Sequence, residues 1–201
     1  MSACDATLSS PPMKTPALDF SKIRTYPVGE RCNKVVLESF AKPHKLGSSF
    51  STFLENLPAF LAVDDLRSIV RDLAEARRNG RPVVLMMGAH PIKVGLNPII
   101  IDSLRSGIVT AVALNGAGAI HDFELCFQGE TSEDVQRGLN DGSFGMAEET
   151  GYMMNQAFRE GAKAGKGAGE ALGAAMTNFP NHHLSILATA YELKIPVTVH
   201  I

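Results

Sequence analysis

Three short apolar runs, separated by longer helical patterns, most constrain what this chain can fold into. The runs are residues 82–87, 108–114 and 195–201, and turn-forming residues bound them. Continuous apolar runs of this length are typical of strands buried on both faces of a sheet. Strands that alternate with helices indicate βαβ units and a parallel sheet. The sequence therefore predicts an α/β fold, with a parallel sheet and flanking helices.

Helical spacing begins at Ser51 and fills the segments between the apolar runs. An irregular stretch precedes Ser51. Five prolines punctuate the first 50 residues, and each removes a backbone donor. We expect residues 1–50 to form an extended N-terminal arm, partly disordered over its first dozen residues. The α/β domain is expected over 51–201, beginning with two helices. Apolar periodicity predicts the helices that follow at 92–106, 120–128, 131–139, 145–176 and 183–193.

Composition excludes several classes of protein. The 201 residues include 19 basic and 21 acidic side chains, so the near-neutral charge argues against nucleic-acid and polybasic membrane binding. No apolar stretch approaches the ~18 residues that span a bilayer, and the N-terminus lacks a signal-peptide pattern. The three cysteines form no CxxC pair, which favours a reducing, cytoplasmic location.

A glycine turn follows the second strand. Gly116, Ala117 and Gly118 stand between that strand and a helix, where backbone N–H groups can approach a phosphate. The dinucleotide fingerprint GxGxxG needs a third glycine, and His121 occupies that position. Ligand binding and a plain tight turn both remain readings of this segment.

Ionisable residues follow the carboxyl ends of all three strands. His90 and Lys93 follow the first, His121 and Asp122 the second, and His200 ends the third. Open α/β sheets bind ligands at this edge, so the five residues predict a functional site there. Three histidines and a carboxylate also suit a metal ion, but no HxH or HxxxH spacing supports one.

Four glycines recur every fourth residue, at Gly161, Gly165, Gly169 and Gly173. The spacing of this run does not match the phosphate-binding pattern GxxxxGK[ST]. On one helix the glycines form a smooth stripe that favours close packing, with ligand contact as the alternative. Cys126 lies in an apolar helical pattern and is expected in the core.

The sequence also resembles a known family. The stretches GAHPIKVGLNPIIIDSLRSGIVTAVALNGAGAIHDFE and NFPNHHLSILATAYELKIPVTVH are similar to the deoxyhypusine synthase family, and closest to its bacterial, deoxyhypusine-synthase-like branch. The resemblance covers residues 82–127 most firmly and 180–201 more weakly. It implies a Rossmann-like sheet, a homotetramer, and NAD bound between subunits.

The resemblance also implies roles for individual residues. Residues that match the family's first NAD-contacting loop are Ala89, His90, Pro91, Ile92 and Lys93. Gly116, Ala117 and Gly118 match its second loop. His121 and Asp122 match a pair of adjacent acidic residues that contact spermidine and NAD. We therefore expect Asp122 to bind the cofactor and His121 to transfer a proton.

The family's reaction is NAD-dependent oxidation of an amine to an imine, followed by aminoalkyl transfer through a lysine. That lysine lies beyond Ile201 in the family, so we expect this chain to be an N-terminal part that does not complete the transfer. The expected substrate is an amine or polyamine. The alternatives are a non-catalytic NAD- or ligand-binding or assembly subunit, and a metal-dependent hydrolase at His90, His121 and His200.

Overall fold

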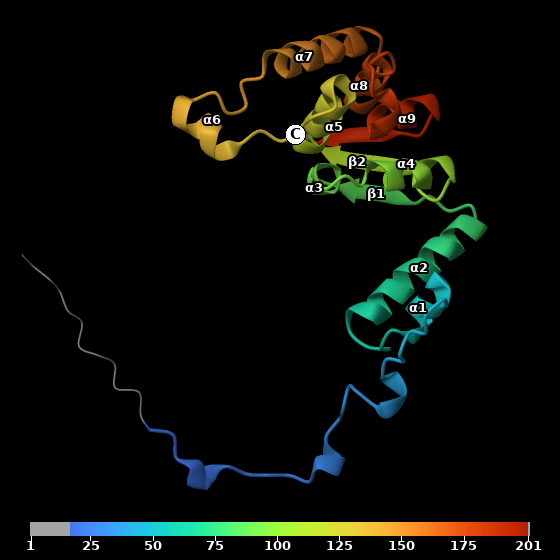
Figure 1. The fold of residues 1–201 in the computed structure, drawn as a ribbon, viewed down its shortest axis with the longest axis vertical. Helices are drawn as coiled ribbons and strands as arrows, with labels where there is room; N and C mark the ends of the chain where they lie inside the picture. The colour runs from blue at the N-terminus through green and yellow to red at the C-terminus, as the bar shows by residue number, and fades with distance from the viewer. Residues whose placement is uncertain (1–16, 201) are drawn as a thin grey trace, which may run out of the picture. The chain divides into compact units, whose positions relative to one another are not determined.

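The computed structural model describes residues 17–200 (Figure 1). The chain divides into two compact units, residues 1–63 and 64–201, a boundary later than the one expected after residue 50. The expected disorder of the first dozen residues, Cys4 and the last residue of the third strand lie outside the described residues. Among residues 17–200, no helix has both the length and the apolar character to cross a bilayer.

Short helical turns joined by extended backbone occupy the described residues that precede Ser49. The turns are η1 (Phe20–Lys22), η2 (Val28–Glu30) and η3 (Leu37–Ser39), and none contains a buried residue. Helix α1 (Phe50–Asn56) begins where Ser49 accepts a hydrogen bond from the Thr52 N–H. Helix α2 (Ala62–Arg78) follows and continues into the second unit.

A three-stranded parallel sheet organises the second unit. Its strands are β1 (Val84–Met87), β2 (Ala111–Asn115) and β3 (Val197–His200), in the order β1-β2-β3. Both pairings are parallel, which confirms the predicted α/β architecture. The carboxyl ends of the strands therefore share one edge, where Asn115 is opposite His200.

The two faces of this sheet differ in burial. Leu85, Val112 and Val197 share one face by register and pack against the hydrophobic core. On the other face Val84 is 53% exposed and Met86 is 76% exposed. The expectation that the first strand is buried on both faces is therefore wrong. The helices that join the strands pack on the first face, so apolar residues on the second face remain in contact with solvent.

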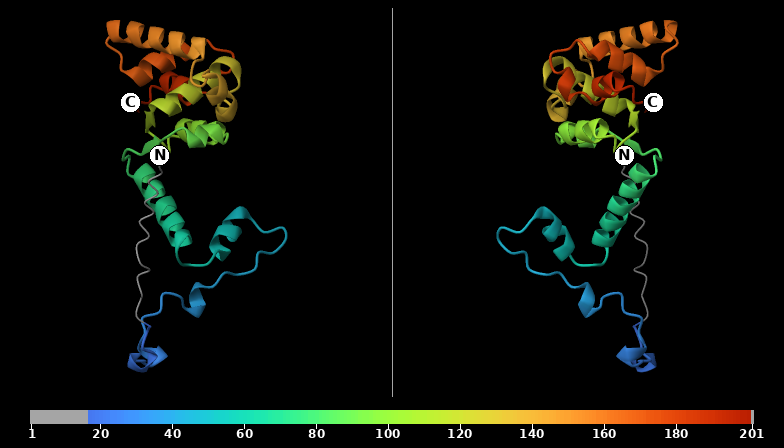
Figure 2. Two further views of the ribbon diagram at one scale, coloured as in Figure 1. Left: turned by 90° about the vertical axis from the view of Figure 1, so that its left-hand side faces the viewer. Right: turned by 90° about the vertical axis from the view of Figure 1, so that its right-hand side faces the viewer.

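Helices fill the connections between the strands (Figures 1 and 2). Glycines with positive φ split two of the expected helices, at Gly95 (φ +79°) and at Gly165 (φ +71°). The observed helices are α3 (His90–Lys93), α4 (Asn97–Arg105), α5 (Gly116–Gln128), α6 (Val135–Asp141), α7 (Glu148–Lys163), α8 (Ala168–Met176), η4 (His182–Leu184) and α9 (Ile186–Glu192).

The core lies between the sheet and helices α4, α5, α8 and α9. Phe123 is fully buried, and its ring centroid lies 6.1 Å from that of Phe127 and 5.6 Å from that of Phe179. Cys126 is buried beside them, as predicted. Burial raises the pKa of the Cys126 thiol to about 12, so it remains a neutral apolar side chain.

The glycine stripe is divided between α7, a turn and α8. Gly161 allows Ala171 to approach α7, and Gly169 lies against the Val197 carbonyl. A Cβ atom at Gly173 would lie 2.6 Å from the Leu187 carbonyl oxygen and 2.9 Å from the Tyr191 Cβ. Close packing is thus confirmed at these three positions, whereas Gly165 ends α7 and contributes to no helical stripe.

We expect Gly173→Ala to lower the free energy of unfolding by about 1–3 kcal/mol, because the added methyl overlaps the backbone of α9. Gly151→Ala in α7 is the matched control. No neighbouring atom lies within 4 Å of its added Cβ, so it should raise stability by about 0.5–1 kcal/mol. Urea unfolding followed by circular dichroism measures both. Equal effects of the two substitutions would contradict the packing described here.

Candidate functional site

The junction of β2 with α5 places helix N–H groups at the carboxyl edge of the sheet. Asn115 ends the strand and caps the helix, and its Oδ1 accepts a 2.8 Å hydrogen bond from the Gly118 N–H. Gly116 and Ala117 are the first two helical residues, whose N–H groups have no intrahelical acceptor. The glycine turn expected from the sequence is therefore the first turn of α5.

One face of α5 borders a cavity of about 450 Å³. Ala117, Ile120, His121 and Glu124 line this wall because they recur at helical spacing. Lys93 of α3 lies at the same cavity. Its other walls come from α7 and from the connecting segment, residues 129–147, and include Ser132, Glu133, Phe144, Thr150, Met154 and Phe158. We call this space the α5–α7 cavity.

His121, Glu124 and Thr150, which line this cavity, belong to a hydrogen-bonded chain that also includes Thr131, next to the lining residue Ser132. His121 Nδ1 lies 2.6 Å from Thr131 Oγ1, and Thr131 Oγ1 lies 2.5 Å from Glu124 Oε2. Thr150 Oγ1 donates a 3.1 Å hydrogen bond to Glu124 Oε1. The side chains of His121 and Glu124 are 17% and 13% exposed. A histidine and a carboxylate are thus held together where little water reaches them.

His121 is shifted toward its neutral form. Burial lowers the pKa of its imidazole, the nearby Glu124 carboxylate raises it, and the Lys93 ammonium lowers it further, with a net decrease. An imidazole that is neutral near pH 7 can accept a proton from a bound molecule. The residue therefore has the protonation state that a general base requires.

Asp122 faces the core although it follows His121 in sequence. Its carboxylate is 0% exposed and accepts hydrogen bonds from Ser185 Oγ (2.7 Å), Leu187 N (2.9 Å), Ile186 N (3.0 Å) and Asn97 Nδ2 (3.0 Å). Burial raises the pKa of Asp122, and these hydrogen bonds oppose the increase. The carboxylate is fully buried in this chain, so the expected contact with a cofactor stays a prediction that this arrangement does not support. Asp122 anchors the start of α9.

Residues 89–93, which follow β1 and Gly88, differ in accessibility. Ala89 and Ile92 are buried, Pro91 is half-buried, and His90 and Lys93 are exposed on α3. Only Lys93 lines the α5–α7 cavity. The first loop expected to contact NAD thus contributes one ammonium group to this cavity.

The convergence predicted at the sheet edge is partial. The structure brings Lys93 and His121 to one cavity, whereas His90 and Asp122 lie outside it. His200 Nε2 instead lies 2.8 Å from Thr198 Oγ1 on the exposed face of the sheet. Within residues 17–200, no group of three or more histidine, cysteine or acidic side chains is arranged to hold a metal ion.

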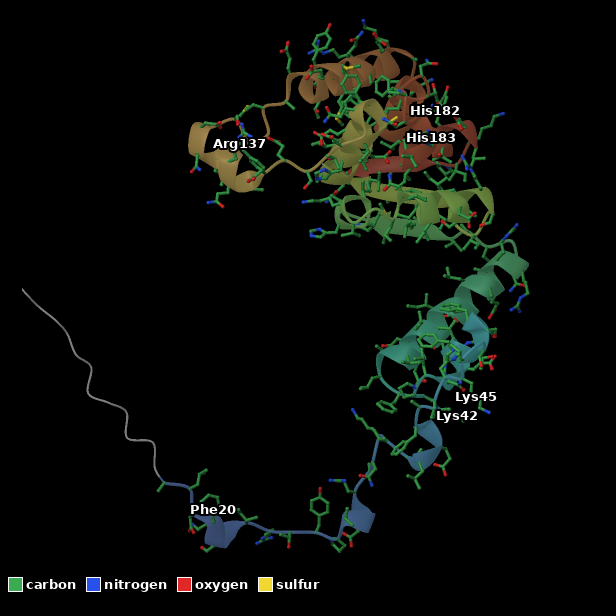
Figure 3. The ribbon with its side chains drawn as sticks, in the orientation of Figure 1. Phe20, Lys42, Lys45, Arg137, His182 and His183 are labelled. Carbon is green, nitrogen blue, oxygen red and sulfur yellow. The ribbon has the colours of Figure 1, made fainter. Side chains whose placement is uncertain are left out.

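Glu124, Thr131 and Thr150 were not among the residues expected at the site. Glu124 stands three residues after His121 on α5, so helical spacing alone places it on the same face. No local sequence pattern indicates the two threonines. Thr150 contacts α5 only because the connecting segment, residues 129–147, brings α7 back beside it. In Figure 3, Arg137 marks α6 within this connecting segment, and His182 and His183 mark η4. Neither histidine lines the α5–α7 cavity.

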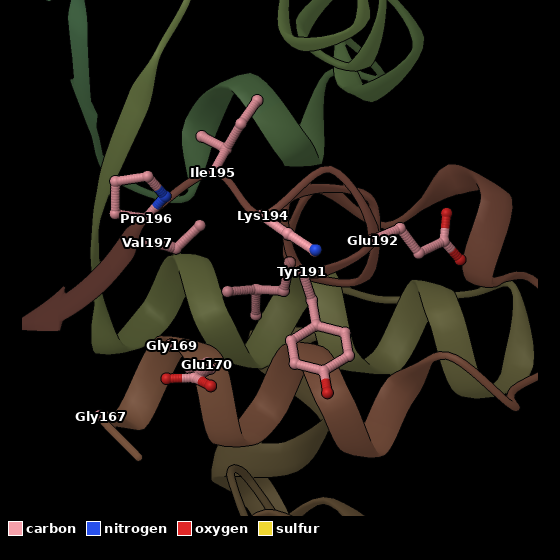
Figure 4. A pocket seen from close by; sticks show the side chains of 10 residues that line it. Gly167, Gly169, Glu170, Tyr191, Glu192, Lys194, Ile195, Pro196 and Val197 are labelled. Carbon is pink, nitrogen blue, oxygen red and sulfur yellow. The ribbon is translucent and has the colours of Figure 1, made fainter.

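A second cavity, of about 670 Å³, lies where β3 begins (Figure 4). Gly169, Tyr191, Lys194 and Pro196 are among the residues that line it. The Lys166 ammonium lies 5.1 Å from the centre of the Tyr191 ring. Gly169 belongs to the glycine stripe and packs on Val197, and it also lines this second cavity.

Comparison of the chain with protein-family models yields no match, and comparison with curated proteins yields none.

Proposed function

We propose that the α5–α7 cavity binds NAD and an amine, and that the protein is a deoxyhypusine-synthase-like, NAD-dependent transferase that first oxidises the amine to an imine. The observation that supports this most is the position of His121, whose lowered pKa favours the neutral imidazole, at a cavity that Ala117 in the first turn of α5 also lines. The proposal includes a Rossmann-like binding mode and a homotetrameric assembly, which follow from the family resemblance. It also includes a cytoplasmic location, which the cysteine usage favours.

The residues at the cavity fit a dinucleotide. Ala117 lines the cavity and Gly116 precedes it, and their N–H groups stand at a helix N-terminus, which favours phosphate oxygens. The Lys93 ammonium adds positive charge at the same cavity. The volume of about 450 Å³ lies in the range of small-molecule sites, and Ile120 and Phe158 supply apolar walls. Asp122 has no part in this proposal, because it is buried.

When bound, NAD would supply a hydride acceptor for the carbon that carries the amine. The chain itself binds and orients the amine and accepts its proton at His121 Nε2. The balance is complete: the amine loses a hydride from carbon and a proton from nitrogen, and becomes an imine. The apolar walls of the cavity exclude water that would otherwise hydrolyse the imine.

The test is amine-dependent formation of NADH by the purified chain, followed by absorbance with mono-, di- and polyamines as substrates. We expect NADH to form only when both NAD and a suitable amine are present. NAD binding without turnover of any amine would favour a ligand-binding subunit. Absence of NAD binding by the folded chain would overturn the proposal.

A further inference from the structure

We infer that Thr131 is a positioning residue that holds His121 in the tautomer with its proton on Nδ1, so that Nε2 is the nitrogen left to accept a proton. The inference rests on the proposed function in one respect, because only that function identifies the bound amine as the molecule that gives a proton to His121. The hydrogen-bonded chain is itself a property of the residues and is tested separately from activity.

The direction of each hydrogen bond follows from counting protons. The Glu124 carboxylate can only accept, so the Thr131 hydroxyl must donate its single proton to Oε2. Thr131 Oγ1 has no second proton to offer His121, yet it lies 2.6 Å from Nδ1. That distance is a hydrogen bond only if Nδ1 carries the proton and donates it to Thr131. Among the described residues, none forms a hydrogen bond with Nε2.

A second hydroxyl fixes the carboxylate that orients Thr131. Thr150 Oγ1 donates to Oε1 of Glu124, so the carboxylate is held through both oxygens. The two threonines come from different segments, Thr131 from residues 129–147 and Thr150 from α7. The working form of His121 therefore requires the connecting segment to lie against α5. Glu133 closes that segment by accepting a 3.0 Å hydrogen bond from the Gly145 N–H.

The charged groups around His121 are few. Lys93 faces it from α3, Glu124 lies on its own helix, and Glu133 lines the cavity from the connecting segment. The Glu124 carboxylate favours a proton on Nδ1 of His121, which is the nitrogen nearer to it. The Lys93 ammonium disfavours a second proton on the same imidazole ring. Together these charges stabilise one neutral tautomer, and Thr131 transmits the effect of the carboxylate to Nδ1.

The experiment is ¹⁵N NMR of the imidazole nitrogens in the histidine-labelled chain, with His121→Gln used to assign the His121 signals. Above the pKa of His121, we expect the wild type to show a protonated Nδ1 and an unprotonated Nε2. Thr131→Val should shift His121 toward the other tautomer, and Thr131→Ser, which keeps the hydroxyl, should restore it. Thr177→Val is the matched control, because the Thr177 hydroxyl bonds only the Ala174 carbonyl.

Activity provides the second readout. Thr131→Val should reduce kcat for NADH formation at least tenfold, within the ~10²–10⁴-fold that a general base contributes. A wild-type His121 protonated on Nε2, or a Thr131→Val protein that keeps the Nδ1–H tautomer, would overturn the inference. If the wild type shows the Nδ1–H tautomer but forms no NADH with any amine, the proposed function fails while the tautomer assignment stands.

Discussion

Asp122→Ala is expected to lower the free energy of unfolding by about 3–5 kcal/mol, among the largest effects of any single substitution in this chain. The fully buried carboxylate accepts hydrogen bonds from the N–H groups of Ile186 and Leu187 and from the hydroxyl of Ser185. Removing it leaves buried donors without acceptors at the start of α9. Urea unfolding followed by circular dichroism gives the difference.

Two further variants make this test specific. Asp122→Asn keeps the shape and one acceptor oxygen, so its loss of stability should be intermediate. Asp102→Ala removes an exposed carboxylate of α4 and should change stability by less than about 0.5 kcal/mol. An Asp122→Ala protein as stable as the Asp102→Ala protein would show that Asp122 does not anchor α9.

His121→Gln is expected to reduce kcat for amine-dependent NADH formation by about 10²–10⁴-fold, because glutamine cannot act as a base. The fold should persist, since His121 lines a cavity rather than the core. Circular dichroism and urea unfolding check that the variant is folded, and NADH absorbance gives the rate. Wild-type turnover by the folded variant would remove His121 from the mechanism.

The pH dependence of NADH formation by the wild type should also show that His121 acts as a base. A base must be unprotonated, so the rate falls as pH falls through the pKa of His121. Burial and the Lys93 ammonium lower that pKa below the ordinary histidine range, with Glu124 in opposition. Activity should therefore persist at pH values where an ordinary histidine is already protonated. A rate that falls at or above the ordinary histidine pKa would contradict this assignment.

The parallel sheet could be predicted because its cause is local. Short apolar runs with turns on either side, separated by helical spacing, admit few arrangements, and the structure has β1, β2 and β3 in those runs. The exposure of one face of β1 could not be predicted in this way. An apolar run records which residues tolerate burial, whereas Met86 is exposed because no described helix packs on its side of the sheet.

The helix breaks illustrate a different limit. Residues on either side of Gly165 share helical spacing, so the sequence gives no sign that the backbone turns there. Gly165 adopts a φ of +71°, and α8 folds back so that Gly169 and Gly173 pack on β3 and α9. Tertiary packing decides this break, and the glycine only permits it.

Only the part of the candidate site that lies on one face of α5 could be predicted from helical spacing. Asp122 follows His121 by one residue, a rotation of about 100° on α5, which is enough to turn it from the cavity into the core. Only a known helix start fixes which of the two faces the cavity. Thr131 reaches His121 because the chain folds back on α5 directly after Gly129, whereas the Thr150–Glu124 bond joins residues 26 apart, which no short motif encodes.

Calorimetric titration of NAD into the wild-type chain would show whether NAD binds beside the first turn of α5, and we expect saturable binding. Ala117→Trp places a large side chain at an exposed position that lines the α5–α7 cavity, so it should abolish saturable binding. Ala175→Trp, at an exposed position of α8 outside that cavity, is the matched control and should bind NAD as the wild type does. Absence of binding by the wild type, or equal binding by both variants, would contradict the account.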